Sequence, residues 1–545
     1  MRSIAGPFVV GPPAGARVRT RLRLSPADEA VLRAVGAHLG RLAGGDLAWR
    51  CRLGGGNDQW ATRKRMATNE SSSRWAGTIT RTSNDQWSRG LRSLVDHRIG
   101  LRRAIRSIRR RLTAPVGGRW GRVNGYATQA ERYAKQRRLQ HLEAELAKVE
   151  GRLNAARISV CRGSHRLAKL RHHLDRADVD RSMAEWQATW QARRWFLTAD
   201  GDATKRWGNE TIRVHPEQLW MELRLPTPLA RLSNTPGRAC TYRLRCPVTF
   251  SYRRDEWMAQ AASGSVRYDI SYQPNRNRWY LDASWQTREI RPPSLDELRR
   301  SRALGVDLNA DHLACWVLDS SGNPVGPPHT VPLRLNALSA STRDGRLREA
   351  IAAILRLARM NECRSIVIEN LDFTDARQTG RETLGRGRRA RYLRKTISGM
   401  PTSRFRTFLA GMAANADLWV IAVDPGWTSK WGQRYWLAPL SRTTKSSIAI
   451  TRHHAAAVVI ARRGQGVGAR RRQGVTGRDQ RIVAGELPAR PDQRLPDYEG
   501  PGPPGGQRAA VVPRKTRPAE RTSSGTRWPR TVRDHRAGST CCSAP

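Results

Sequence analysis

The chain has 545 residues, and its 98 Lys and Arg against 46 Asp and Glu give a formal net charge of +52. This length allows roughly two to four domains with cores of their own. The basic excess is larger than solubility requires and favours a polyanionic partner, because basic residues that neutralise phosphates release counterions. A basic surface in a protein from an arginine-rich proteome is the alternative explanation.

Hydropathy and cysteine usage exclude several classes of protein. No apolar run approaches the roughly 20 residues of a membrane span, and the run at 4–10 is interrupted by Pro7 and makes a poor signal peptide. The eight cysteines contain no Cys-x-x-Cys pair, so neither a zinc ribbon nor a disulfide framework is predicted. We expect a cytoplasmic, nucleoid-associated protein with free thiols and no membrane contact.

Residues near the N-terminus predict a strand followed by a helix. In residues 16–24 apolar side chains alternate with arginines, a period of two that predicts a strand with one apolar and one basic face. Ser25, Pro26 and Asp28 then predict a helix start, with Ser as N-cap, Pro at the first helical position and acid in the first turn. We expect residues 26–189 to form a basic helical unit.

Two segments of this unit have apolar seams. Residues 101–112 and 139–153 carry apolar side chains at spacings of three and four, which is typical of amphipathic packing. Arginines fill the other faces of the first segment, and such a face suits the phosphates of a duplex or of folded RNA. We predict that nucleic acid contacts Arg102, Arg103, Arg106, Arg109 and Arg110.

The pattern changes after residue 190, where alternating aromatic and β-branched residues replace the helical spacing. The runs 266–272 and 278–285, joined by a short turn rich in Pro and Asn, predict a β-hairpin. We expect a small β-rich domain that combines residues 1–25 with 190–295. Its Trp and Tyr residues are interpreted mainly as core.

Residues 296–465 predict an α/β domain. Three strands come first and are followed by strands that alternate with helices, which is the order of an RNase H-like fold. The strands are expected at 303–308, 312–318, about 328–333, 365–369 and 418–424, and the helices at 347–360, 403–416 and 451–463. Residues 466–545 contain few apolar residues and are predicted to be a disordered tail rich in Pro, Gly and Arg.

Two acidic residues of this domain form a candidate metal site. Asp307 lies in the first apolar strand, where an unpaired buried carboxylate is expensive, and Glu369 ends the fourth. In an RNase H-like fold the first strand lies beside the fourth, so the two carboxylates would face each other. Such a pair can bind Mg²⁺ or Mn²⁺, and two such ions can activate water for phosphodiester cleavage. Strand-end acids that only favour solubility are the alternative.

Three motifs occur in the same order as in a known family of nucleases. They are Gly-Val-Asp-Leu-Asn at 305–309, Val-Ile-Glu-Asn-Leu at 367–371 and Val-Asp-Pro-Gly-Trp-Thr-Ser at 423–429. Across about 303–464 the chain resembles the transposon-encoded TnpB nucleases, which share these landmarks with compact type V CRISPR effectors. The resemblance implies a RuvC-like nuclease domain whose metal ligands include Asp307 and Glu369. It also implies a guide RNA that directs the binding and cutting of double-stranded DNA.

The remainder of the chain resembles the family only in layout. By that layout, residues 1–25 and 190–295 would form a wedge-like nucleic-acid-binding domain, and residues 26–189 a helical recognition lobe. The strongly basic segment 376–396 adds further predicted nucleic-acid contacts, at Arg386, Arg388, Arg389 and Arg391.

Two departures from the family pattern affect the candidate site. The cysteine pairs that hold zinc in the family are absent, so no zinc is predicted. An apolar cluster is expected in their place, formed by Trp427, Trp431 and Trp436. His453 stands where the family has its third aspartate. Its imidazole is either a metal ligand, although it suits Mg²⁺ less well than a carboxylate does, or, with His454, a contact for phosphate or a local cap. Asp424 is the second choice for an acidic ligand.

The leading hypothesis is therefore an RNA-guided DNA-binding protein with a divalent-metal-dependent endonuclease domain, of transposon or CRISPR-like type. The alternative is a guided binder with weakened or lost cleavage, because His453 replaces a carboxylate. A third hypothesis is a general basic nucleic-acid protein of a mobile element that keeps the nuclease fold without its activity.

Overall fold

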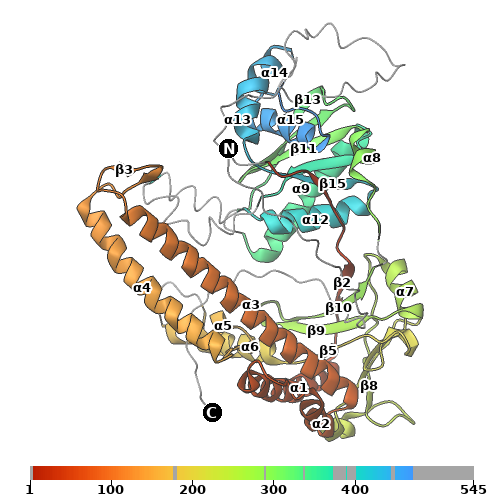
Figure 1. Ribbon diagram of the computed structural model, residues 1–545. Helices are drawn as coiled ribbons and strands as arrows, with labels where there is room; N and C mark the ends of the chain where they lie inside the picture. The colour runs from red at the N-terminus through yellow and green to blue at the C-terminus, as the bar shows by residue number, and fades with distance from the viewer. Residues whose placement is uncertain are drawn as a thin grey trace, which may run out of the picture.

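The computed structural model describes residues 4–175, 181–287, 290–335, 338–371, 388, 400–443 and 448–470 (Figure 1). Most of the basic segment 376–396 and the tail beyond residue 470 lie outside the described residues, and the predictions made for them stay predictions. Of the tail, residues 466–470 are described. They contact α15 (Arg452–Gly464) through the hydrogen bond from Arg462 Nε to the Gly468 carbonyl at 2.7 Å.

A six-stranded mixed sheet dominates the C-terminal part of the chain. Its order is β1 (Phe8–Val10), β15 (Trp419–Val423), β14 (Ser365–Glu369), β11 (Ala303–Leu308), β12 (His312–Leu318) and β13 (Pro324–Pro332). The strands β11, β12 and β13 pair antiparallel, whereas β14 pairs parallel with both β11 and β15. The first strand of the predicted domain thus lies beside the fourth, which is the strand order expected of an RNase H-like fold.

Some predicted boundaries in this region are confirmed and others are wrong. The strands predicted at 303–308, 312–318 and 365–369 are observed at those bounds. The strand predicted at about 328–333 is longer, and helix α9 (Ala340–Met360) begins seven residues earlier than predicted, because Ser339 accepts a hydrogen bond from the backbone of Thr342 as its N-cap. The strand predicted at 418–424 ends at Val423, so Asp424 lies just beyond it.

Helices cover both faces of the six-stranded sheet. Apolar residues on one face, such as Leu304 and Val306 of β11, pack against α9 and α12 (Thr402–Ala414). The alternate residues of the same strand face α15, because successive strand residues point to opposite faces. Figure 1 shows α15 and α12 on opposite sides of the sheet. The second face is the one that carries Asp307.

Helix α15 lies unusually close to β11. A Cβ added at Gly305 would lie 2.1 Å from the carbonyl oxygen of Ala457, so only glycine permits this approach. The residues 454–464 of α15 are all buried. This close packing fixes the start of α15, and with it His453, against the end of β11.

The tryptophan cluster predicted in place of a zinc site is only partly present. Trp436 is buried with Trp316 and Leu440, and Trp431 packs beside them. Trp427 is 49% exposed and adopts a positive φ of 68°, so its predicted membership in the cluster is wrong. It begins the turn into α13 (Thr428–Trp431), which leads through η5 (Gly432–Trp436) to α14 (Leu437–Thr443).

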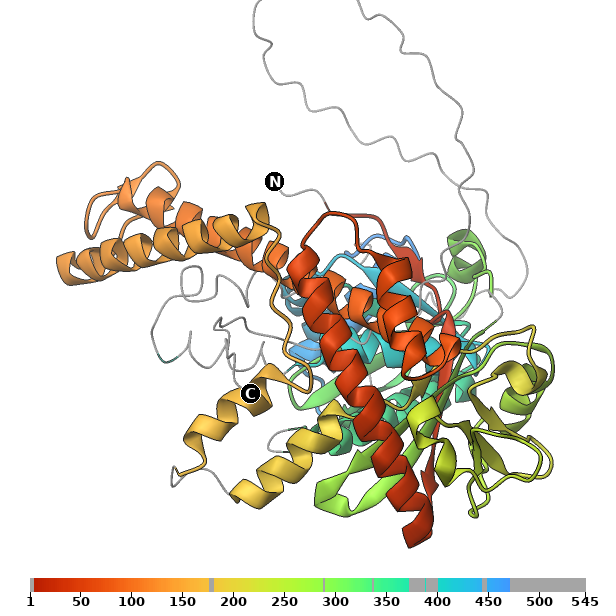
Figure 2. The same cartoon turned by 90° about the horizontal axis from the view of Figure 1, so that it is seen from below.

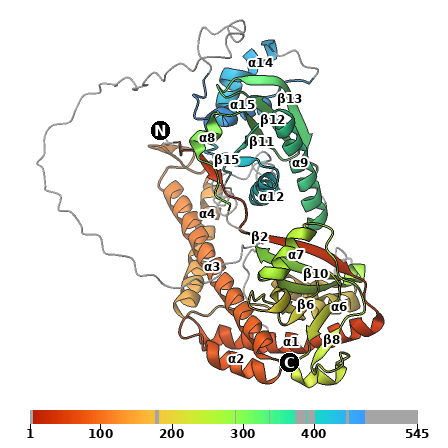
Figure 3. The ribbon, with the colours of Figure 1, turned by 90° about the vertical axis from the view of Figure 1, so that its right-hand side faces the viewer.

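The N-terminal segment joins two different sheets. Strand β1 pairs antiparallel with β15, whereas β2 (Gly15–Leu22) pairs with β10 (Arg278–Gln286). The assignment of all of residues 1–25 to the β-rich domain is therefore wrong for β1. Figure 3 shows the beginning of the chain passing from the six-stranded sheet to β2.

The sheet that receives β2 has four strands. Its order is β2, β10, β9 (Arg267–Gln273) and β5 (Thr198–Ala199), and the hairpin predicted at 266–285 is β9–β10. One face is core, with Val18, Leu281 and Trp279 buried. Beside this sheet are α7 (Arg254–Ser263) and a three-stranded sheet of β6 (Ile212–Val214), β7 (Met221–Arg224) and β8 (Thr241–Arg243).

Helices fill most of residues 26–194. They are α1 (Pro26–Leu53), α2 (Trp60–Asn69), α3 (Ser73–Leu112), α4 (Gln129–Asn154), α5 (His165–Leu170) and α6 (Met183–Arg194). The predicted cap of α1 is confirmed, since Ser25 and Asp28 form a capping box. The two predicted apolar seams pack against each other, so α3 and α4 form a long helical hairpin that extends away from the sheets (Figure 2).

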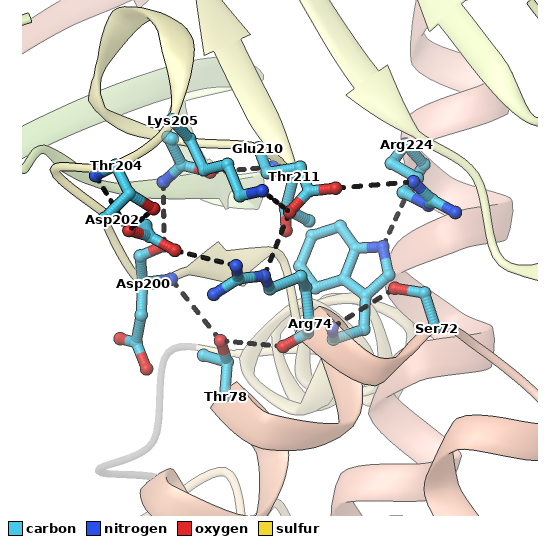
Figure 4. A network of polar contacts seen from close by, with 12 residues as sticks. Ser72, Arg74, Thr78, Asp200, Asp202, Thr204, Lys205, Glu210, Thr211 and Arg224 are labelled. Carbon is cyan, nitrogen blue, oxygen red and sulfur yellow. Dashed lines mark hydrogen bonds and ion pairs between the residues drawn. The ribbon is translucent and has the colours of Figure 1, made fainter.

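The base of α3 is tied to the β strands by a polar network (Figure 4). Arg74 forms ion pairs with Asp202 at 2.7 Å and with Glu210 at 3.0 Å. About two turns further along, Arg81 pairs with Asp200 at 2.8 Å. These side chains are partly exposed, so each pair contributes little alone. Burial of Trp75, whose indole N–H donates to the Arg224 carbonyl at 2.9 Å, contributes more.

Candidate functional site

Asp307 is a buried carboxylate with neighbours from two elements. It is 4% exposed on β11, on the face that α15 covers. Its Oδ2 accepts hydrogen bonds from Asn309 Nδ2 at 3.1 Å and from His453 Nδ1 at 2.9 Å. A buried carboxylate needs such donors. Both donors use the same oxygen.

Glu369 lies next to Asp307 across the parallel strand pair. The pairing of Val306 with Ile368 places Asp307 and Glu369 at the next position of adjacent strands. Burial, and after it the negative charge of Asp307, raises the pKa of Glu369 to about 7. The Thr428 hydroxyl donates to Glu369 Oε1, and the charge of Arg463 also opposes the rise. The sequence prediction that these two carboxylates meet is thus consistent with the strand register.

Asp424, the second choice for an acidic ligand, accepts hydrogen bonds from backbone N–H groups on both of its carboxylate oxygens. Its Oδ1 accepts from the Gly426 N–H at 2.7 Å, and its Oδ2 from the Ala5 N–H at 3.1 Å. Arg463, near the end of α15, donates to the carbonyl oxygens of Asp424 and Gly426. These contacts fix the turn after β15, from which Thr428 reaches Glu369.

The two adjacent histidines at the start of α15 differ in role. His453 donates from Nδ1 to Asp307, and its Nε2 lies 3.4 Å from Arg452 Nε, so in this arrangement it is a partner of the carboxylate. Its ring also meets the edge of His312 at 5.3 Å between centroids. His454 is buried, accepts the backbone N–H of Thr451 at 3.1 Å and contacts Thr330 Oγ1 at 2.9 Å. His454 is therefore a local cap, as one of the alternatives stated.

Three residues near the carboxylates were not predicted from the sequence. Asn309 and Thr428 stand inside the motifs that carry the family resemblance, so the motifs contained a signal for them. Arg463 had no such signal, because an arginine at the end of an amphipathic helix is usually exposed. Among the residues that the structure describes, no group of three or more His, Cys, Asp or Glu is arranged to hold a metal ion.

The predicted basic contacts on α3 divide into two groups. Arg102 pairs with Glu150 at 2.5 Å and Arg109 with Glu143 at 2.6 Å, so part of their charge is used to join α3 to α4. Arg106 and Arg110 are exposed and line a shallow depression of about 510 Å³ beside this pair. Arg103 is exposed as well. Of the second predicted group, Arg388 is exposed, and Arg386, Arg389 and Arg391 lie outside the described residues.

Two further features concern membrane-spanning helices and the pairing of cysteines. No described helix is long and apolar enough to cross a membrane. No disulfide joins any of the six cysteines within the described ranges.

No protein-family model matches the chain, and no curated protein matches it. One similar solved structure is T. thermophilus RuvC in complex with a Holliday junction substrate, with 17% identity, coverage of 30% of this chain and 91% of that chain, and a TM-score of 0.21. Another is a cryo-EM structure of a Cas12f1–sgRNA–target DNA complex, with 12% identity, coverage of 49% of this chain and 66% of that chain, and a TM-score of 0.22. These scores are too low to carry an argument about function.

Proposed function

We propose that the protein binds nucleic acid and cleaves DNA with a divalent-metal-dependent, RuvC-like endonuclease site. The observation that carries this proposal is the register of β11 and β14, which sets Asp307 beside Glu369 on the face covered by α15. Two neighbouring carboxylates with one pKa raised to about 7 are typical of a functional site. The net charge of +52 supplies the attraction for a polyanionic substrate.

The carboxylates fit one divalent cation. Burial, and after it the repulsion from Asp307, raises the pKa of Glu369, and a bound cation relieves both costs. Asp307 and Glu369 would hold Mg²⁺ or Mn²⁺, which when bound supplies Lewis acidity and a more acidic water. Asn309 orients Asp307, and Thr428 orients Glu369. His453 occupies Oδ2 of Asp307, so the residues fit a second ion less well than an aspartate at that position would allow.

The finer proposal is guidance by RNA. It rests on the motif resemblance to TnpB nucleases and compact type V effectors. Under this proposal residues 26–189 act as a recognition lobe for guide RNA and heteroduplex, and the β-rich residues 190–295 with β2 act as a wedge-like domain. Double-stranded DNA is the target, and base pairing with the guide reads its sequence, while the protein contacts backbone. The protein acts in the cytoplasm, at the nucleoid.

A second candidate function is guided binding without cleavage. The hydrogen bond between His453 and Asp307 favours it, because the imidazole N–H takes the place where a third carboxylate would help hold metal. Under this alternative the protein occupies a DNA target and leaves it intact. Asp307 then stabilises the start of α15 rather than a metal ion.

The experiment purifies the full chain with its copurifying RNA, sequences that RNA, and supplies a matching DNA duplex with Mg²⁺ or Mn²⁺. The first proposal expects products that EDTA, Asp307→Ala and Glu369→Ala each abolish. Asp311→Asn is the matched control, because Asp311 is close in sequence but its side chain is 79% exposed. Cleavage that survives Asp307→Ala and Glu369→Ala contradicts the site. Binding without products supports the alternative, and a gain of cleavage in His453→Asp would identify the histidine as the cause.

A further inference from the structure

A row of arginines runs along the solvent face of β2. Arg17, Arg19 and Arg21 alternate with core residues of that strand, and Arg23 continues the row just beyond it. All four side chains are exposed. Neighbours in the row are two residues apart, or about 6.6 Å along the strand. The row therefore presents positive charge at a regular spacing on one face of the four-stranded sheet.

The first half of the row is balanced within the protein. Asp282, which pairs with Arg19 across the β2–β10 register, is 2% exposed. Its Oδ2 lies 2.9 Å from Arg17 and 2.7 Å from Arg19. Arg19 makes a second hydrogen bond, from Nε to Oδ1 at 2.8 Å, so the contact is bidentate. This half of the row is therefore engaged within the sheet.

The second half of the row has no such balance. Tyr280, not an acid, stands opposite Arg21. Arg23 follows Leu22 and Arg278 precedes Trp279, the last pair of the register, and both arginines line the same depression, so their like charges repel. Within the described residues no ion pair involves Arg21, Arg23 or Arg278, whereas the ion pair of Arg17 and Arg19 with Asp282 lies on the same face.

The three unbalanced arginines line one concave surface. It has a volume of about 340 Å³, and Leu24, Glu29 and Asn277 contribute to its wall. Glu29 is the one acid in this wall, and its carboxylate bonds Arg33 at 3.1 Å, along α1 and not across the depression. Nothing else in the wall offsets the charge.

We infer that Arg21, Arg23 and Arg278 form a binding site for the phosphate groups of a nucleic-acid backbone. Guanidinium groups match phosphate geometry with two parallel N–H donors. A strand of nucleic acid brings several linked phosphates, so it can satisfy more than one of these arginines and remove their mutual repulsion. The inference rests on nucleic-acid binding in the proposed function, but on neither cleavage nor a guide.

The test measures how affinity of the full chain depends on salt. The chain is freed of bound nucleic acid and titrated, in EDTA, with a fluorescein-labelled DNA duplex and with a labelled single-stranded RNA. The variant carries Arg21→Gln, Arg23→Gln and Arg278→Gln. Each lost phosphate contact lowers the slope of log K against log salt by about 0.9 for duplex and about 0.7 for a single strand. For duplex, the loss of affinity between about 50 and 200 mM salt then shrinks roughly 40-fold.

Two further variants make the result specific. Replacing the same three arginines by lysine keeps the charge and restores the slope. Arg19→Gln, on the same strand and face, changes the slope by less than any of the three, because Arg19 already shares Asp282. A reduced slope with RNA alone, or with duplex alone, names the strand that occupies the site. An unchanged slope with both probes overturns the inference.

Thermal unfolding of the free protein separates binding from folding. Arg278→Gln removes the repulsion between residue 278 and Arg23, so the unfolding midpoint should rise at low salt, and the gain should vanish at high salt. A lower midpoint would show that the arginines hold the fold and would overturn the inference. The two proposals fail separately: a chain that shows the slope change but no cleavage contradicts only the nuclease proposal, and a chain that cleaves with an unchanged slope contradicts only this one.

Discussion

The two large sheets of the protein carry charge in opposite ways. The six-stranded sheet is covered by helices on both faces and keeps two acids, Asp307 and Glu369, side by side on its central strands, on the face that α15 covers. The four-stranded sheet leaves one face to solvent and arranges arginines along β2. Each sheet also has a carboxylate in or next to it whose two oxygens both accept hydrogen bonds. Asp424, just after β15, accepts from backbone N–H groups, and Asp282 on β10 accepts from two arginines.

The contrast between paired and incompletely paired charges indicates where each sheet would bind a ligand. Charges that are paired within the protein, such as Asp282, stabilise the strand pair to which they belong. Glu369, whose burial beside Asp307 is only partly offset by Thr428 and Arg463, costs free energy in the isolated protein. Arg278, which has no ion pair among the described residues, costs free energy beside Arg23. A cation at the first and a polyanion at the second would remove that cost. Variants that remove or add single charges therefore test the comparison directly.

The largest effect is expected for Glu369→Gln, which keeps the size of the side chain but removes its charge. If a metal ion supplies about 4 kcal/mol to the barrier, cleavage falls about 1,000-fold. The metal-free protein should gain stability, on the order of 2 kcal/mol, above neutral pH. The pKa of Glu369 in the folded chain, about 7, lies above its ordinary 4.5, so the wild type loses stability as pH rises between these values, and the Gln variant does not.

Urea unfolding in EDTA at a series of pH values measures the difference in stability between the wild type and Glu369→Gln. Cleavage assays at saturating Mn²⁺ measure the loss of activity. Equal stability of the two chains from acid to alkaline pH would show that Glu369 carries no unfavourable charge. The six-stranded sheet would then contain no unfavourable acidic charge at Glu369, and its proposed contrast with the arginines of the four-stranded sheet would be wrong.

The next largest effect concerns the contact that positions α15. Gly305→Ala places a Cβ 2.1 Å from the Ala457 carbonyl oxygen, so β11 and α15 must separate. We expect a loss of about 3 kcal/mol in the free energy of unfolding and a weaker contact between His453 and Asp307. Gly345→Ala in α9 is the matched control, because its Cβ meets nothing within 4 Å. It should stabilise the chain by roughly 0.5–1 kcal/mol. Denaturant unfolding that gives both variants the same sign of change contradicts this packing.

A smaller effect is expected from the residue that holds Glu369 in place. Thr428→Val keeps the shape of a side chain that is 1% exposed but removes the hydroxyl that donates to Glu369. Loss of a group that orients a metal ligand typically costs 10–100-fold in metal affinity or activity. Calorimetric titration with Mn²⁺ measures this without relying on turnover. Thr407→Val on the exposed side of α12 is the control and should leave metal affinity unchanged. Equal affinities in the two variants would remove Thr428 from the site.

The sequence predicted the central strands well because their signal is local. The apolar run 303–308 has a carboxylate next to its last residue, the run 365–369 ends on one, and both have turn residues around them, so both bounds and burial follow. The edge strand β1 could not be predicted in this way. It has three residues, flanked by Pro7 and Gly11, and no period. The neighbouring hydrogen bond between Ala5 and Asp424 spans 419 residues, a separation at which local pattern carries no information.

In the candidate site, too, some contacts follow from local sequence signals and others depend on tertiary packing. The meeting of Asp307 with Glu369 follows from strand order, which the sequence of elements predicts. The contact between His453 and Asp307 follows from the packing of α15 on Gly305, which depends on a tertiary approach. Arg463 is a stronger example: its helical spacing predicts an exposed cation, whereas its guanidinium is buried against the turn after β15.

The smallest effect distinguishes the two halves of the arginine row. Burial raises the pKa of Asp282, but hydrogen bonds from Arg19 and Arg17 outweigh burial and hold this pKa below its ordinary value. Asp282→Asn should therefore cost about 1–2 kcal/mol near neutral pH, since the two arginines are half exposed and regain water. The stability that Asp282 provides is present above its ordinary pKa and is lost as pH falls, so the two chains should converge in acid. Arg21→Gln, two residues along the same face, should stay within about 0.5 kcal/mol of wild type at every pH. If Arg21→Gln destabilises the fold as much as Asp282→Asn does, Arg21 has a structural partner, and the division of the row into a balanced and an unbalanced half is wrong.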